Sequence, residues 1–154
     1  MATYQQLTRV SLRIRALRRV ALDTPYTSLA HSVASLIAKP PFADNTSLVV
    51  DATGVGRPVV DFLKAARPPC RLLPVVITGP GQATQSNGVF HVPRQDLIAN
   101  LQILIETREL SVARTATHAD SLEIELSQFS RRRTARDDLV FATALASWAA
   151  IKRY

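Results

Sequence analysis

The stretch from Ser47 to Gly56, Ser-Leu-Val-Val-Asp-Ala-Thr-Gly-Val-Gly, constrains the fold of this chain more than any other. An uninterrupted apolar run that is closed by Asp51 and two glycines is typical of a buried strand in an α/β sheet. Gly54 and Gly56 permit a tight turn, and Pro58 suits the first turn of a following helix. The sequence therefore predicts a strand, a glycine turn and a helix. In open α/β sheets, ligands and chemistry collect at the carboxyl end of such a strand.

Three interpretations of this unit compete. A dinucleotide-binding fingerprint needs a third glycine at the position of Val59, so that motif is absent. Asp51 could instead help to hold a divalent metal ion, which requires partner acids elsewhere in the chain. It could also be an ordinary turn-forming or helix-capping aspartate.

The charge balance of the 154 residues favours an anionic partner. Nineteen Lys and Arg residues against twelve Asp and Glu residues give a formal charge of +7 and a pI near 10.5. Arginine dominates, because the only lysines are Lys39, Lys64 and Lys152. Such a surface favours polyanions, nucleic acid first, although an ordinary basic surface remains the alternative.

The remaining composition describes a single globular domain. A length of 154 residues with 47% hydrophobic content suffices for a core. No apolar run approaches membrane-spanning length, and the N-terminal region has no apolar signal-peptide core. The single cysteine, Cys70, excludes an internal disulfide framework and favours a structural thiol. We expect a cytoplasmic protein without membrane contact.

Hydrophobic periodicity predicts an alternation of strands and helices. We expect strands over 9–16, 47–51, 71–77 and 110–113, with an extended piece over 89–92. The strand over 71–77 should pair in parallel with that over 47–51, with a helix as the crossover. We expect a polar loop over 78–88. Helices are expected over 28–39, 57–66, 93–107, 116–129 and 139–152.

Two groups of arginines are candidates for contact with nucleic acid. Arg13 and Arg15 alternate with apolar residues, so they share the polar face of the first strand. They could lie along a phosphate backbone or keep an exposed strand edge from pairing. Arg131, Arg132 and Arg133 follow a predicted helix, whose dipole accounts for one or two of them. The third suggests a phosphate contact.

Asp137 and Asp138 stand where the last helix begins, and the helix dipole alone accounts for one acid there. Asp138 has Ala142, Leu145 and Ala149 on its own face, which places it beside the apolar stripe of the helix. This position favours Asp138 over Asp137 as a functional acid, without excluding Asp137.

Asp51 at a strand end and Asp137 or Asp138 at a helix start could meet at one edge of the sheet. Carboxylates are the hard oxygen ligands that Mg²⁺ takes. Two or three carboxylates on a shared edge can build a metal site for in-line phosphodiester cleavage. Asp51, Asp137 and Asp138 are therefore the candidate catalytic and metal-binding residues.

Four segments, in their order and spacing, resemble a known family. They are Leu48–Asp61, Pro74–Gly79, Val92–Leu97, and Asp137–Ala146 followed by Trp148. Together they resemble the C-terminal nuclease domain of the large subunit of phage terminases, the DNA-packaging motor. The resemblance covers most of the chain, from about Thr24 onward.

This resemblance implies a ribonuclease H-like α/β fold, a mixed sheet flanked by helices, in one domain over residues 1–154. It implies Mg²⁺- or Mn²⁺-dependent endonucleolytic cleavage of double-stranded DNA during genome packaging in a bacterial cytoplasm. The implied partners are the terminase ATPase domain, the small subunit and the portal. Asp51 matches the second metal-binding acid of the family, and one of Asp137 and Asp138 matches the third. Arg136 stands where the family usually has histidine.

The chain departs from the family pattern near its N-terminus. The first metal acid of the family lies on a strand upstream of residues 9–16, whereas no acid precedes Asp23 here. The phosphate-binding motif of the motor domain, Gly-x4-Gly-Lys-Ser/Thr, does not occur either. We therefore expect a prophage remnant or the product of a split gene, with the first strand missing and cleavage impaired. The alternative is a non-catalytic remnant that binds DNA or protein through its basic surface.

Overall fold

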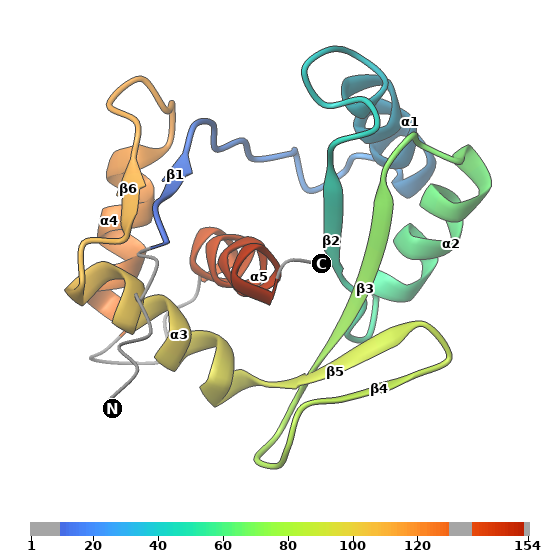
Figure 1. Cartoon of the computed structure of the whole chain (residues 1–154). Coiled ribbons are helices and arrows are strands. Elements are labelled where there is room, and N and C mark those ends of the chain that lie inside the picture. The colour runs from blue at the N-terminus through green and yellow to red at the C-terminus, as the bar shows by residue number, and fades with distance from the viewer. Residues whose placement is uncertain (1–9, 130–136, 153–154) are drawn as a thin grey trace, which may run out of the picture.

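The computed structural model describes residues 10–129 and 137–152. Over these residues the chain has an α/β architecture with five helices and six strands (Figure 1). In chain order the elements are β1 (Leu12–Ile14), α1 (Tyr26–Ile37), β2 (Ser47–Asp51), α2 (Gly56–Ala66), β3 (Arg71–Thr78), β4 (Thr84–Ser86), β5 (Val89–Pro93), α3 (Arg94–Glu106), β6 (Leu110–Val112), α4 (Ala119–Phe129) and α5 (Asp138–Lys152).

The main sheet has the strand order β2-β3-β5-β4 and is mixed. β2, β3 and β5 run parallel, and α2 forms the crossover from β2 to β3, which confirms the predicted strand–helix–strand unit. Pro74 is tolerated within β3 because it precedes Val75, the first residue of β3 that pairs with β5. Among the described strands, β2 pairs with β3 alone and therefore forms one edge of this sheet.

β1 and β6 form a separate parallel pair, with Arg13 opposite Ser111. The predicted strand over 9–16 is shorter within the described residues, where it spans only Leu12–Ile14. Its faces follow the predicted alternation, because Leu12 and Ile14 are half-buried while Arg13 is exposed.

The prediction of an irregular loop over 78–88 was wrong for its second half. Residues Thr84–Ser86 form β4, which pairs with β5 in an antiparallel hairpin. Asn87 and Gly88 connect the two strands, with φ of 50° and 74°. Positive φ at both central residues is the type I′ turn that Asn-Gly favours, so the turn signal was present in the sequence.

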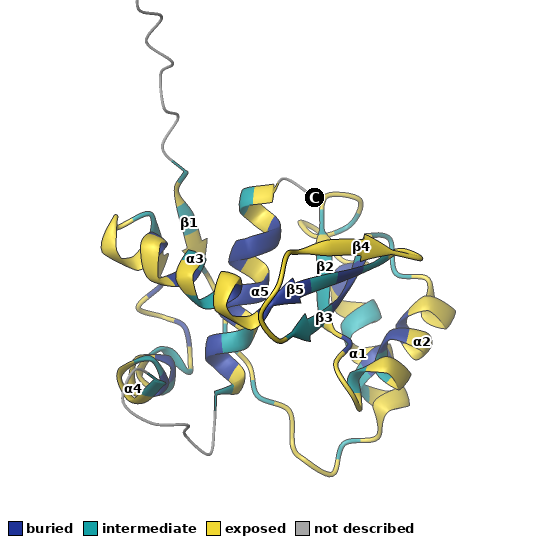
Figure 2. Ribbon diagram, turned by 90° about the horizontal axis from the view of Figure 1, so that it is seen from below, coloured by how far each residue is buried: buried dark blue, intermediate teal, exposed yellow. Residues whose placement is uncertain are grey.

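The core forms around α5, whose buried residues include Leu145 and Trp148. The ring of Trp148 meets that of Phe90 on β5 edge to face, with centroids 5.5 Å apart. α5 packs on one side of the sheet, and α1 and α2 lie on the other side (Figure 1). Figure 2 shows the buried residues gathered along α5 and the neighbouring strands. None of the described helices has the length and apolar character needed to cross a bilayer.

Candidate functional site

Asp51 ends β2 at the carboxyl edge of the parallel strands, as predicted. Its side chain is exposed, and Oδ1 accepts a hydrogen bond of 2.8 Å from the backbone N–H of Thr53. The hydroxyl oxygen of Thr53 accepts the N–H of Ile77 at 2.9 Å, so the loop is tied to β3. Within the described part of the chain, Asp51 has no cationic partner. The structure therefore holds this carboxylate in place and leaves it open to solvent.

Gly56 allows α2 to begin directly against the end of β2. A Cβ atom at this position would lie 2.0 Å from the carbonyl oxygen of Asp51, which is far inside van der Waals contact. Gly54 meets a different demand, because its φ of +56° lies in the left-handed region while the space around it is open. The two glycines thus serve the strand-end geometry that places Asp51.

Asp138 is bound by an arginine from the N-terminal segment. Nη1 of Arg19 donates to Oδ2 of Asp138 at 2.5 Å, and Nη2 of Arg19 donates to Glu125 of α4. Glu125 is 5% exposed, and its Oε2 accepts the backbone N–H groups of Leu139 at 3.0 Å and Val140 at 3.3 Å. Glu125 therefore caps α5 from another helix, and Arg19 neutralises it.

Asp137 faces a second arginine. Nη2 of Arg94 lies 3.5 Å from Oδ2 of Asp137. The guanidinium of Arg94 also lies 5.2 Å from the ring centroid of Phe129 and 4.5 Å from that of Phe141. This stacking fixes Arg94 at the junction of α3, α4 and α5.

Asp138 is more exposed than its sequence pattern suggested. Its side chain is 64% exposed against 38% for Asp137. On the same face Ala142 is also exposed, whereas Leu145 and Ala149 are buried as predicted. α5 is apolar almost all round, so periodicity alone could not tell which stripe would be covered.

The three predicted acids do not form a metal-binding cluster by themselves. In the ranges 10–129 and 137–152, no group of three or more His, Cys, Asp or Glu side chains is placed to hold a metal ion. Asp137 and Asp138 adjoin at the start of α5, each facing an arginine, while Asp51 lies at the end of β2. Metal binding by these residues stays a prediction.

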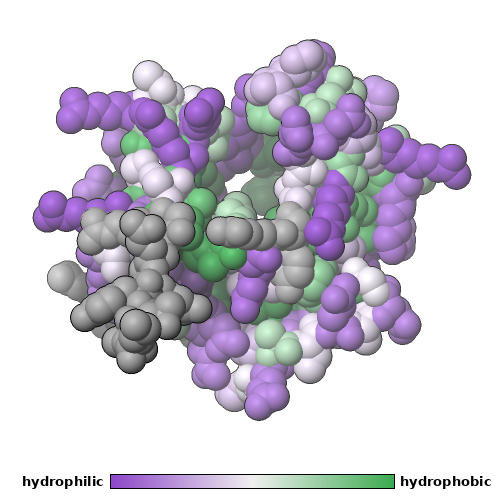
Figure 3. All heavy atoms as spheres, in the orientation of Figure 1, coloured by the Kyte–Doolittle hydropathy of each residue, from purple (hydrophilic) through white to green (hydrophobic). Residues whose placement is uncertain are grey.

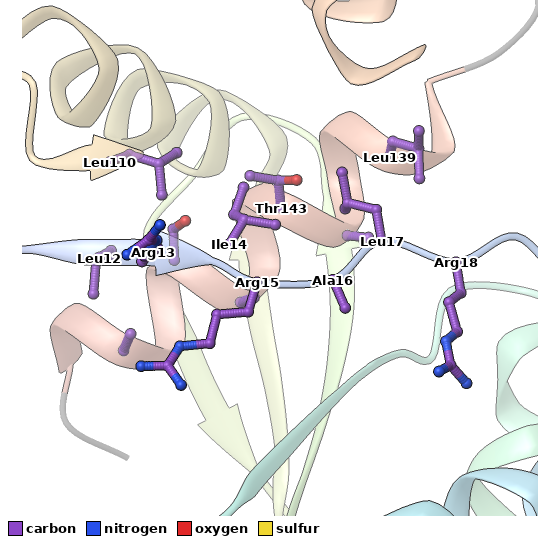
Figure 4. A pocket seen from close by; sticks show the side chains of 14 residues that line it. Leu12, Arg13, Ile14, Arg15, Ala16, Leu17, Arg18, Leu110, Leu139 and Thr143 are labelled. Atoms are coloured by element: carbon purple, nitrogen blue, oxygen red, sulfur yellow. The ribbon is translucent and has the colours of Figure 1, made fainter. Parts of the chain in front are cut away.

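Arg13 and Arg15, together with Arg18, line a groove of about 450 Å³ between residues 12–18 and α5. All three are exposed and have no carboxylate partner among the described residues. In Figure 4, Ile14 and Leu17 point toward α5, whereas Arg15 and Arg18 project from the opposite side of the segment. The other predicted nucleic-acid contacts, Arg131, Arg132 and Arg133, lie outside the described residues.

Cys70 lies half-buried in the connection before β3. Burial raises the pKa of its thiol, although a hydrogen bond from the backbone of Leu48 acts in the opposite direction. A thiol with a raised pKa is a poor nucleophile at neutral pH, which agrees with the predicted structural cysteine.

Sequence reasoning assigned no role to Arg19, Glu125 or Arg94. The signal for Glu125 was present, because it lies three residues after Leu122 and one before Leu126, on the buried stripe of its helix. A charge at such a position requires a partner, but the sequence did not identify Arg19 as that partner.

Comparison of the chain with protein families, with curated proteins and with solved structures gives no match.

Proposed function

We propose that this chain is a terminase-type nuclease domain with a ribonuclease H-like fold, acting on double-stranded DNA, whose own residues supply part of a metal site. The observation that carries the proposal is the state of Asp51. This exposed carboxylate has no counter-ion among residues 10–129 and 137–152, and it is held at the carboxyl end of a parallel strand, where α/β proteins place their chemistry. If Asp51 only formed a turn, its hydrogen bond to Thr53 would be explained. Its position at the end of a parallel strand would not be.

The chain's acids suit Mg²⁺ or Mn²⁺. Of the two carboxylate oxygens of Asp51, Oδ1 accepts a hydrogen bond from the described residues and Oδ2 accepts none from them, so Oδ2 is available as a hard oxygen ligand. Asp138 could serve as a second ligand once its bond to Arg19 is exchanged for the ion. A metal bound there would activate the attacking water and neutralise the leaving oxygen of a phosphodiester.

Substitution of Asp51 tests this proposal. The expected result is a Mn²⁺-dependent rise in melting temperature for the unaltered chain that is lost in Asp51→Asn, with any Mn²⁺-dependent plasmid nicking lost in parallel. Asp61→Asn is the matched control, because Asp61 is an exposed acid on α2 outside the predicted site. A Mn²⁺ response that persists when Asp51→Asn and Asp138→Asn are combined would refute metal binding by these acids.

A second candidate function is DNA binding without cleavage. It is favoured by the engagement of Asp138 with Arg19 and of Asp137 with Arg94, which leaves two predicted ligands already neutralised. Arg13, Arg15 and Arg18, which have no carboxylate partner among the described residues, would then contact DNA phosphates. The affinity for DNA should therefore fall steeply as the salt concentration rises.

Charge reversal on that face should weaken DNA binding. For Arg13→Glu combined with Arg15→Glu, we expect a lower affinity and a salt dependence whose slope falls by about 0.9 for each lost phosphate contact. Fluorescence anisotropy with a labelled duplex over a range of salt concentrations measures both. Arg57→Glu combined with Lys64→Glu on α2 changes the net charge equally, so equal weakening by both pairs would show that no defined face is used.

A further inference from the structure

β2 presents an unpaired edge. The C=O of Thr46 and the N–H of Ala52 bond to β3. Because backbone groups of alternate residues point to opposite sides of a strand, the N–H and C=O groups of Val49 and Asp51 point away from β3. Neither residue has a backbone partner on that side within residues 10–129 and 137–152. A row of free donors and acceptors of this kind is a template for another strand.

The edge lacks the features that usually prevent strand pairing. Leu48, Val49 and Val50 are apolar and only half-buried, and β2 contains no lysine or proline. The strand is thus unprotected, and its side chains would be covered further by a neighbour.

α5 provides a floor beside this edge. It packs against both β1 and β2, and it lies between them in Figure 1. Ala142, Ala146 and Ala150 are exposed and recur every four residues, so they form one stripe along the helix. This alanine stripe lines the groove beside residues 12–18. Figure 3 shows this face of the molecule hollowed between the parts that carry β1 and β2.

The groove also contains an unpartnered buried hydroxyl. Thr143 lines it with 4% of its surface exposed, and its Oγ1 has no hydrogen-bond partner in the part of the chain that the structure describes. Such a group is costly to bury alone, and a bound polar chain could supply its partner.

The chemistry of the groove selects the kind of occupant. Arg13, Arg15 and Arg18 line it, and none of the three has an acidic partner within residues 10–129 and 137–152, which favours an anionic chain. None of the described residues that line it is aromatic, so it offers no surface on which the bases of a single-stranded nucleic acid could stack. A second copy of the chain would bring its own formal charge of +7 to the same arginines, which opposes self-association.

We propose that an extended acidic strand of another protein pairs with the free edge of β2 and lies over the alanine stripe of α5. Its backbone bonds the groups of Val49 and Asp51, and its carboxylates face the arginines of residues 12–18. The inference goes beyond the proposed action on DNA and holds whether or not the domain cleaves a phosphodiester.

The test uses capped peptides of alternating glutamate and valine, about nine residues long, and amide NMR spectra of the whole chain. Backbone pairing supplies most of the affinity in strand addition, so saturable binding is expected without a specific sequence. The shifted amides should include Val49 and Asp51 and those of the alanine stripe. The same peptide N-methylated at alternate residues should not bind, and a lysine–valine peptide should not bind either.

Variants of the chain locate the binding. Ala146→Phe, at an exposed position, fills the groove and should abolish binding, while Ala65→Phe, at an exposed position on α2, should not change it. Arg15→Glu should weaken binding about tenfold. The absence of any shift up to millimolar peptide, or equal binding of the N-methylated peptide, would overturn the proposal. Two other results would also overturn the proposal. One is a homodimer of the chain in light scattering. The other is a single-stranded oligonucleotide that binds the unaltered chain but not Ala146→Phe.

Discussion

Replacing Glu125 by alanine is expected to lower the free energy of unfolding by about 3 kcal/mol, within the range for breaking a buried ion pair. Two losses add up. The N–H groups of Leu139 and Val140 at the start of α5 lose their acceptor in a buried environment. Arg19 loses the carboxylate that it neutralises, although its side chain is 26% exposed and can be partly rehydrated.

Glu123→Ala is the matched control, because Glu123 lies on the same helix with its side chain exposed. We expect that variant to change the free energy of unfolding by no more than about 0.5 kcal/mol. Urea unfolding followed by circular dichroism measures both. Similar losses in the two variants would show that helix propensity, and not the cap on α5, accounts for the effect.

The role of Arg19 can be separated by a double-mutant cycle. Arg19→Ala, Glu125→Ala and the double variant should be non-additive, because the two side chains form one network. In the double variant no charge is left without its partner, so its loss of stability should fall well below the sum of the single losses.

The structure around Asp51 could be predicted from sequence because it depends on neighbours in the chain. An apolar run, two glycines and an amphipathic helix specify the β2–α2–β3 unit within residues 47–78, and its parallel pairing was confirmed. The Asn87-Gly88 hairpin also depends on neighbouring residues alone, but a loop was predicted there despite the Asn-Gly pair.

The surroundings of α5 could not be predicted in the same way. Glu125 and Arg19 are 106 positions apart, and no local pattern links them. Asp138 was predicted to lie beside a covered stripe of Ala142, Leu145 and Ala149. Leu145 and Ala149 are buried, but Ala142 and Asp138 itself are exposed. When a helix is apolar on nearly every side, its hydrophobic periodicity does not show which side will be buried. The buried side then depends on which strands are present to pack against the helix.

The exposed alanine stripe and the free edge of β2 therefore have one physical explanation. An apolar helix face and an unprotected strand edge, side by side, would be covered together by a single extended chain.

The second large effect is expected for Gly56→Ala, with a loss of about 2–3 kcal/mol in the free energy of unfolding, in the upper part of the range for steric overpacking. The added Cβ would lie 2.0 Å from the carbonyl oxygen of Asp51, so the start of α2 or the end of β2 must move. Gly54→Ala should cost about 1–2 kcal/mol, because it meets no atom and only strains a left-handed conformation. Gly79→Ala, with neither constraint, should be nearly neutral.

This order, Gly56 above Gly54 above Gly79, separates steric contact from conformational strain and can be measured by urea unfolding of the three variants. Equal costs for Gly54→Ala and Gly56→Ala would contradict the close approach of α2 to β2. The displaced atom belongs to Asp51, so Gly56→Ala should also reduce any Mn²⁺ response in samples that are fully folded. Gly54→Ala should reduce that response less, because its strain does not act on the strand end directly. A Mn²⁺ response that is unchanged in folded Gly56→Ala would show that the position of Asp51 does not govern metal binding.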